Sequence, residues 1–83
     1  MTLLKFEANW CAPCKTMTAI MKGMDYTPVD IETEDGENLA ITYGVRSIPT
    51  LILVADDGEV VSTSIGVKSR HTLDKWLAED EIC

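Results

Sequence analysis

The sequence lacks several features that would place it in common functional classes. It has no apolar run of membrane-spanning length, no basic segment leading into an apolar run at its start, and no repeat, linker or low-complexity tract. Basic residues are few, with seven Lys and Arg against fourteen Asp and Glu, and the formal net charge is −7. Such a charge repels phosphate backbones and anionic lipids, so we expect no nucleic-acid or membrane partner. We expect a cytoplasmic monomer, in a compartment that keeps thiols reduced.

The residues that are present have the composition of an ordinary globular domain. The 83 residues are 46% hydrophobic and 25% charged, which favours a folded chain over a disordered one. A chain of this length buries only somewhat more than ~60% of its unfolded surface. We therefore predict one domain, residues 1–83, with a thin core.

Two of the three cysteines lie three positions apart, in the stretch Trp10-Cys11-Ala12-Pro13-Cys14-Lys15. An apolar run before them predicts a strand, and the periodicity after them predicts a helix. Residues i and i+3 share a helix face at about 5 to 6 Å, a separation that a disulfide spans. Free N–H groups and the dipole at a helix N-terminus lower the pKa of a thiol there, most for Cys11. The pattern predicts a redox pair with Cys11 as the reactive thiol and Cys14 as the more buried one.

Two other uses of the pair remain open. One is a structural staple, although closing so short a loop removes little entropy from the unfolded chain. The other is a zinc site, because a Cys-x-x-Cys pair forms half of many such sites. The only further soft ligands are His71 and Cys83, which are not spaced as a second pair. We favour redox use, expect no metal, and expect Cys83 to be a free thiol outside the mechanism.

Strands and helices alternate in the rest of the pattern. Strands are expected at 3–8, 26–31, 50–55 and 60–65, and helices at about 11–24, at about 36–43 and after a cap at Ser69. Pro28 suits an edge strand, whereas the continuous apolar run 50–55 suits an interior one. The expected inward-facing residues of the three helices are Met17, Ile20, Met21 and Met24, then Leu39, Ala40 and Tyr43, then Leu73, Trp76 and Leu77. The pattern predicts an α/β fold in the order strand, helix, strand, helix, hairpin, helix.

Three stretches in the same order resemble the thioredoxin family. The first is Trp10 to Lys15, similar to the family's active-site signature, with Ala12 where Gly is usual. The second, Tyr43-Gly44-Val45-Arg46-Ser47-Ile48-Pro49-Thr50, is similar to the segment with the family's cis-proline, and the third is Gly66 followed by Ser69. The resemblance covers residues 3–79. It implies a minimal thioredoxin fold, with a four-stranded mixed sheet in the order 2-1-3-4, strand 3 antiparallel to strand 1, and three helices.

The resemblance also implies a function. It implies a thiol-disulfide oxidoreductase that reduces protein disulfides, with Cys11 attacking the substrate and Cys14 resolving the mixed disulfide. The Cys11–Cys14 disulfide would be the redox group, with no bound cofactor. Pro49 would have a cis bond, and the backbone of Ile48 would pair with an extended substrate segment. The other residues of the implied substrate-binding surface are Trp10, Ala12, Pro13 and Gly66.

The implied partners are disulfide-containing proteins and an electron donor similar to thioredoxin reductase. The alternative is a glutathione-dependent, glutaredoxin-like reductase. That family commonly carries a Gly-Gly pair followed by an acid near the last helix, whereas Ile65-Gly66-Val67-Lys68 has one Gly and no such acid. A non-catalytic metal-binding or interaction domain is the third possibility, and the least favoured.

Lys5 is the clearest departure from the family. Thioredoxins commonly have a buried Asp at this position, beneath the cysteines, and often a Lys where this chain has Pro28. Two interpretations of Lys5 are open. Its ammonium either points towards the cysteines and favours thiolates, or it reaches solvent, paired with Glu7 two residues along the same face.

Overall fold

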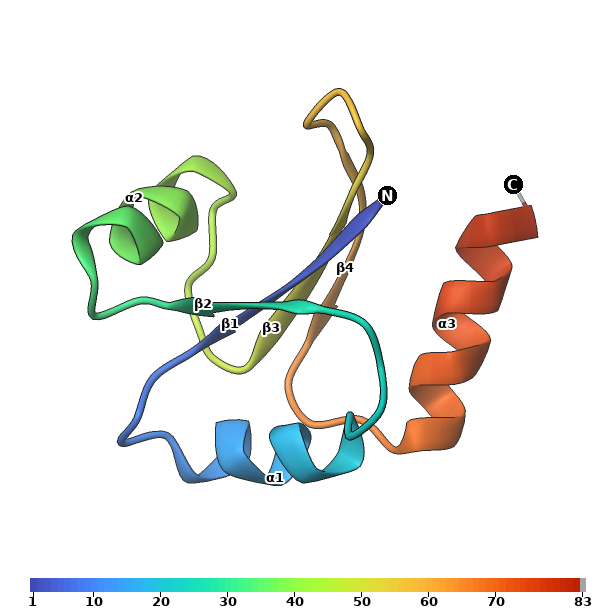
Figure 1. The fold of residues 1–83 in the computed structure, drawn as a ribbon, viewed down its shortest axis with the longest axis horizontal. Coiled ribbons are helices and arrows are strands. Elements are labelled where there is room, and N and C mark those ends of the chain that lie inside the picture. The colour runs from blue at the N-terminus through green and yellow to red at the C-terminus, as the bar shows by residue number, and fades with distance from the viewer. Residues whose placement is uncertain (83) are drawn as a thin grey trace.

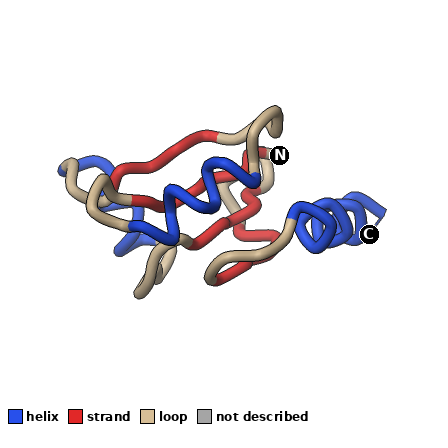
Figure 2. Tube along the Cα trace, turned by 90° about the horizontal axis from the view of Figure 1, so that it is seen from below, coloured by secondary structure: helices blue, strands red, loops and turns tan. Residues whose placement is uncertain are grey.

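The computed structural model describes residues 1–82, with side chains to residue 79, and contains one four-stranded sheet with helices packed against both faces (Figure 1). The elements are β1 (Thr2–Glu7), α1 (Ala12–Ile20), β2 (Thr27–Asp30), α2 (Glu34–Thr42), β3 (Thr50–Val54), β4 (Val60–Ile65) and α3 (Arg70–Ile82). Helices α2 and α3 lie at opposite ends of the molecule in both views, with α1 between them (Figure 2). The predicted fold class and element order are confirmed. Cys83 lies outside the described residues.

The strands form one sheet in the order β2-β1-β3-β4, as predicted. Strand β1 is parallel to β2 and antiparallel to β3, and β3 is antiparallel to β4. Every residue of β3 is buried, as the apolar run predicted for an interior strand. Pro28 lies in the edge strand β2, where its missing N–H can face away from the ladder.

Each face of the sheet has its own cluster of buried side chains, because successive residues of a strand point to opposite faces. The face that carries α1 and α3 buries Leu3, Met17, Met21, Leu51, Leu53 and Leu73. The face that carries α2 buries Phe6, Val29, Ile52 and Val54. Most of the predicted inward residues of the helices pack here, including Trp76, whose indole N–H donates to Ser62 Oγ at 2.7 Å.

Helix α1 is shorter than predicted. It ends at Ile20, with Met21 as the C-cap, whereas the apolar spacing predicted a helix to about residue 24. The backbone N–H of Met21 donates to the Met17 carbonyl and that of Lys22 to the Ala19 carbonyl, and Gly23 then takes φ of +86°, in the left-handed region that ends helices. Met24 still packs against the core from the turn that follows.

Helix α2 begins two residues earlier than predicted, and its inner face is different. Thr33 is the N-cap, and its Oγ1 accepts from the Gly36 N–H at 3.0 Å, so the acidic run forms the first turn. Gly36 is buried against the backbone of Asp30. Together with Ala40 and Tyr43 it forms the inner face at i, i+4 and i+7. Leu39 lies at the edge of that face and is exposed, so its predicted core position is wrong.

Candidate active site

Cys11 is the N-cap of α1. Its backbone is extended, with φ −89° and ψ 102°, and its Sγ accepts a hydrogen bond from the backbone N–H of Cys14 at 3.1 Å. The Cys11 N–H in turn donates to the Ala8 carbonyl at 3.1 Å, just after the end of β1. Ala12 and Pro13 occupy the first two helical positions, where no N–H has an intrahelical partner and Pro is tolerated. The sulfur of Cys11 therefore lies where a helix favours negative charge.

Cys11 and Cys14 form a disulfide, with their Cα atoms 5.2 Å apart. This separation is within the range predicted from their spacing on a helix. Both side chains are buried, Cys11 being 4% and Cys14 2% exposed. Cys14 is the less exposed of the two, as predicted, but the difference in exposed fraction is too small to distinguish the two thiols. Ile31 and Ile48 pack against the buried cluster that Ala8 forms with the two cysteines.

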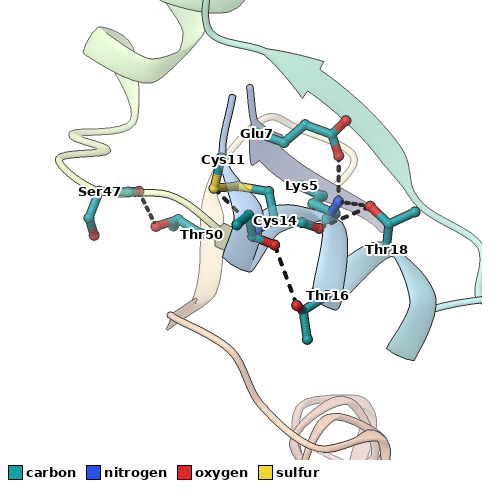
Figure 3. The surroundings of a disulfide bond; sticks show 9 residues. Lys5, Glu7, Cys11, Cys14, Thr16, Thr18, Ser47 and Thr50 are labelled. Atoms are coloured by element: carbon teal, nitrogen blue, oxygen red, sulfur yellow. Dashed lines mark hydrogen bonds and ion pairs between the residues drawn. A yellow bond between two sulfur atoms is a disulfide. The ribbon is translucent and has the colours of Figure 1, made fainter. Parts of the chain in front are cut away.

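The second predicted segment lies against this disulfide. Ile48 packs against the buried cluster that contains both cysteines, and the Ile48–Pro49 peptide bond is cis, as the resemblance implied. Just after it, the hydroxyl of Thr50 donates to the Ser47 carbonyl at 2.7 Å, which ties the two ends of this turn together (Figure 3). Among residues 1–82, the N–H and C=O of Ile48 make no hydrogen bond.

The remaining predicted site residues surround the same place. The N–H of Gly66 donates to the Pro49 carbonyl at 2.9 Å, which joins the third predicted segment to the second. Trp10 is 66% exposed, and Ala12 and Pro13 are also exposed. The structure thus brings all three segments to one end of the sheet, with a buried disulfide and an exposed rim.

Lys5 of β1 is fully buried, with 0% of its side chain exposed. Its ammonium donates to Glu7 Oε1 at 2.5 Å and to Thr18 Oγ1 at 2.6 Å, and the Thr18 hydroxyl donates to the Cys14 carbonyl at 3.0 Å (Figure 3). The pairing with Glu7 is confirmed, but the interpretation in which Lys5 reaches solvent is wrong. Sequence reasoning missed Thr18. Its position four residues after Cys14, on the same side of α1, was the available signal.

No three His, Cys, Asp or Glu side chains among the described residues are close enough together to hold a metal ion. His71 is exposed in the first turn of α3. Between residues 1 and 82, no helix combines the length and the apolar character needed to cross a membrane. The redox-active group of this site is the disulfide of the chain itself.

Known proteins share both the sequence pattern and the fold. The thioredoxin family model matches residues 1–79. The chain belongs to the thioredoxin family. It is 40% identical over 81 residues to a thioredoxin of Bacillus subtilis, a match that covers 90% of this chain and 77% of the relative. A thioredoxin of Chlamydia trachomatis is 33% identical over 86 residues, covering 98% of this chain and 83% of the relative.

The fold comparison agrees with the sequence match. A crystal structure of a thioredoxin from Nicotiana alata, 28% identical, has a TM-score of 0.79 and covers 95% of this chain and 71% of its own. With the paired cysteines at the start of α1, this membership confirms the predicted function: the protein is a thiol-disulfide oxidoreductase.

Proposed function

We propose that this thioredoxin-family protein reduces disulfides in other proteins by two successive exchanges. The Cys11 thiolate attacks one sulfur of a substrate disulfide, and the other substrate sulfur leaves and takes up a proton. Cys14, as a thiolate, then attacks Cys11 Sγ, which forms the Cys11–Cys14 disulfide and releases the second substrate thiol. Two electrons pass from the protein to the substrate.

One observation supports the choice of Cys11 as the attacking group. Its Sγ occupies the N-cap and already accepts the Cys14 N–H at 3.1 Å. A thiolate at that atom would keep this hydrogen bond and gain from the helix dipole. Cys14 is inside the first turn, and its carbonyl is tied to Thr18. The proposal therefore rests on the position of Cys11 and not on its exposure.

The substrate side of the proposal uses the exposed rim. An extended segment of the substrate would pair with the unbonded N–H and C=O of Ile48 as a short added strand. Trp10, Ala12, Pro13 and Gly66 would contact its side chains, while Pro49 shapes the loop beneath. Substrates would therefore be disulfides in extended, accessible segments of proteins.

The working context that we propose is a cytoplasmic monomer, folded as one domain, that receives electrons from a flavoprotein reductase. The relatives described above carry the name thioredoxin, and this supports a reductase over glutathione as donor.

Turnover of a disulfide-bonded model protein tests the donor. The purified protein is assayed with insulin as substrate, once with NADPH and a thioredoxin reductase and once with glutathione and glutathione reductase. We expect turnover with the first system and little with the second, in both cases compared with a Cys11→Ser variant that gives the background rate. Faster turnover with glutathione would favour the glutaredoxin-like alternative.

A further inference from the structure

Lys5 is the one fully buried charged side chain among residues 1–79. Burial of an ammonium is costly unless it is paired and hydrogen-bonded, and an apolar residue of similar volume is often as stable at such a site. Folding stability is therefore a weak explanation for a buried Lys at this position. Its position beside the redox pair indicates a role in the chemistry.

The contacts of Lys5 connect it to the helix that carries the cysteines. Its ammonium bonds Thr18 Oγ1 at 2.6 Å, and that hydroxyl bonds the Cys14 carbonyl at 3.0 Å, so two hydrogen bonds separate the charge from the backbone of Cys14. Glu7 contacts the same ammonium from the side of β1 and is 30% exposed. Figure 3 shows Lys5 between Glu7 and Thr18, next to the disulfide. The Lys5 ammonium of this ion pair is therefore buried, whereas the Glu7 side chain is partly exposed at the surface.

The other neighbours of Lys5 add no charge. In the sheet it lies between Pro28 of β2 and Leu51 of β3, and the helix α3 contributes Leu73 to the same face. The ring of Tyr26, before β2, lies 5.8 Å from the ammonium, within the range of a favourable cation–π contact. Among the described residues, two kinds of charged group are thus left to interact with the Lys5 ammonium. One is the carboxylate of Glu7, and the other is the thiolate of the reduced cysteine pair.

We propose that Lys5 is a positioning residue that stabilises the reduced, anionic form of the Cys11–Cys14 pair, and that Glu7 limits this effect by offsetting part of the charge. The proposal rests on thiol-disulfide exchange by these two cysteines. In the disulfide no sulfur is charged, whereas after two-electron reduction a thiolate forms near the ammonium. Lys5 therefore favours the reduced state over the oxidised one.

The expected effect can be bounded from Coulomb's law. A unit positive charge about 7 Å from a thiol changes the acid dissociation constant of that thiol about 50-fold at an effective dielectric of ~20. In water-like surroundings the change is about 3-fold. Because Glu7 offsets part of the charge, we expect a change near the lower bound, of about 3-fold to 10-fold. The two members of the pair must act in opposite directions. Loss of Lys5 raises the thiol pKa, and loss of the Glu7 charge lowers it.

The test compares Lys5→Met and Glu7→Gln in the full chain, with Lys75→Met as a matched control at an exposed site on α3. Thiolate absorbance at about 240 nm is titrated against pH in the reduced proteins. We expect the lower thiol pKa to rise in Lys5→Met, to fall in Glu7→Gln, and to stay unchanged in Lys75→Met. Thr18→Val, which removes the hydroxyl and keeps the shape, is expected to shift the pKa in the direction of Lys5→Met.

The dithiol–disulfide equilibrium of each variant with glutathione gives a second readout. Lys5→Met is expected to be about 3-fold to 10-fold more readily oxidised than the parent protein, and Glu7→Gln less readily oxidised. Superimposable titrations of the parent, Lys5→Met and Glu7→Gln would overturn the proposal, and so would shifts of both variants in the same direction. Neither readout requires substrate turnover, so a protein that fails to reduce insulin can still confirm or refute the role of Lys5. If Lys5→Met does not fold, Glu7→Gln alone decides, because it keeps the buried ammonium.

Discussion

At the scale of single residues, Cys11 and Cys14 share one bond but have different surroundings. Cys11 Sγ is capped by a backbone N–H, and Cys14 lies within the helix. We expect Cys11→Ser to abolish disulfide reduction, and Cys14→Ser to accumulate a mixed disulfide with substrate because the resolving thiol is absent. Iodoacetamide labelling of the reduced parent at neutral pH should modify Cys11 first. Faster labelling of Cys14, read by peptide mass, would reverse the assignment.

Gly36 is important for packing, because its lack of a side chain allows α2 to approach β2 closely. A Cβ at this position would overlap the carbonyl oxygen of Asp30 and lie 2.6 Å from its carbonyl carbon. Both of these atoms belong to the backbone, so relief requires a shift of the helix. We expect Gly36→Ala to lower the free energy of unfolding by about 1 to 3 kcal/mol, measured by urea denaturation.

Asn38→Ala is the matched control for Gly36→Ala, since Asn38 is an exposed residue of the same helix. Its effect should stay within about 0.5 kcal/mol. If Gly36→Ala is as stable as the parent protein, the close approach of α2 to Asp30 is not maintained in solution.

Lys5 shows where residue-level prediction from sequence ends. Its place in a strand, on the same face as Leu3, followed from the alternation of β1. Whether its ammonium was buried could not be predicted, because that depends on Glu7 and Thr18 meeting it from two elements. The burial of Gly36 was hidden for the same reason. A contact between segments has no local pattern in the sequence.

At the scale of elements, one side chain of α3 hydrogen-bonds the carbonyls at the end of α1, beside the core cluster that the two helices share. Arg70 Nη1 donates to the carbonyls of Lys22 at 3.0 Å and Ile20 at 3.4 Å, and its Nε pairs with Asp74 at 3.2 Å. Carbonyls at a helix C-terminus lack intrahelical partners and attract positive charge. We expect Arg70→Met to lower the free energy of unfolding by about 1 kcal/mol in urea denaturation.

The control for Arg70→Met is Lys75→Met, which removes an exposed charge from the same helix. Its effect should stay within about 0.5 kcal/mol. Equal losses in the two variants would show that Arg70 contributes general charge and no specific link between α1 and α3.

Element order and the interior position of β3 followed from the sequence because hydrophobic periodicity reports burial directly. Element ends were less predictable. The spacing of Met17, Met21 and Met24 continued past the true end of α1, because residues in a turn can also pack against the core. The three segments of the site could be located in the sequence, and the resemblance implied that they form one surface, but the contacts that join them, Ile48 against the cysteines and Gly66 to Pro49, are known only from the structure.

At the scale of the whole molecule, the disulfide is expected to contribute little to stability. The loop between Cys11 and Cys14 is so short that closing it removes no more than about 2 kcal/mol of unfolded-state entropy, and both clusters of the core lie outside it. We expect the reduced protein to keep its far-ultraviolet circular dichroism and to lose no more than about 2 kcal/mol of unfolding free energy. Unfolding on reduction would instead favour the structural staple that the spacing left open.

The antiparallel pairing of β1 with β3 separates the molecule into two ends. Thr2 pairs with Val54 at one end and Phe6 with Thr50 at the other, next to Pro49 and the cysteines. The amino group of Met1 donates to Asp56 Oδ1 at 2.9 Å, in the turn between β3 and β4. A fluorophore, affinity handle or surface linker attached at Met1 or in that turn would thus leave the reactive end facing away from its support.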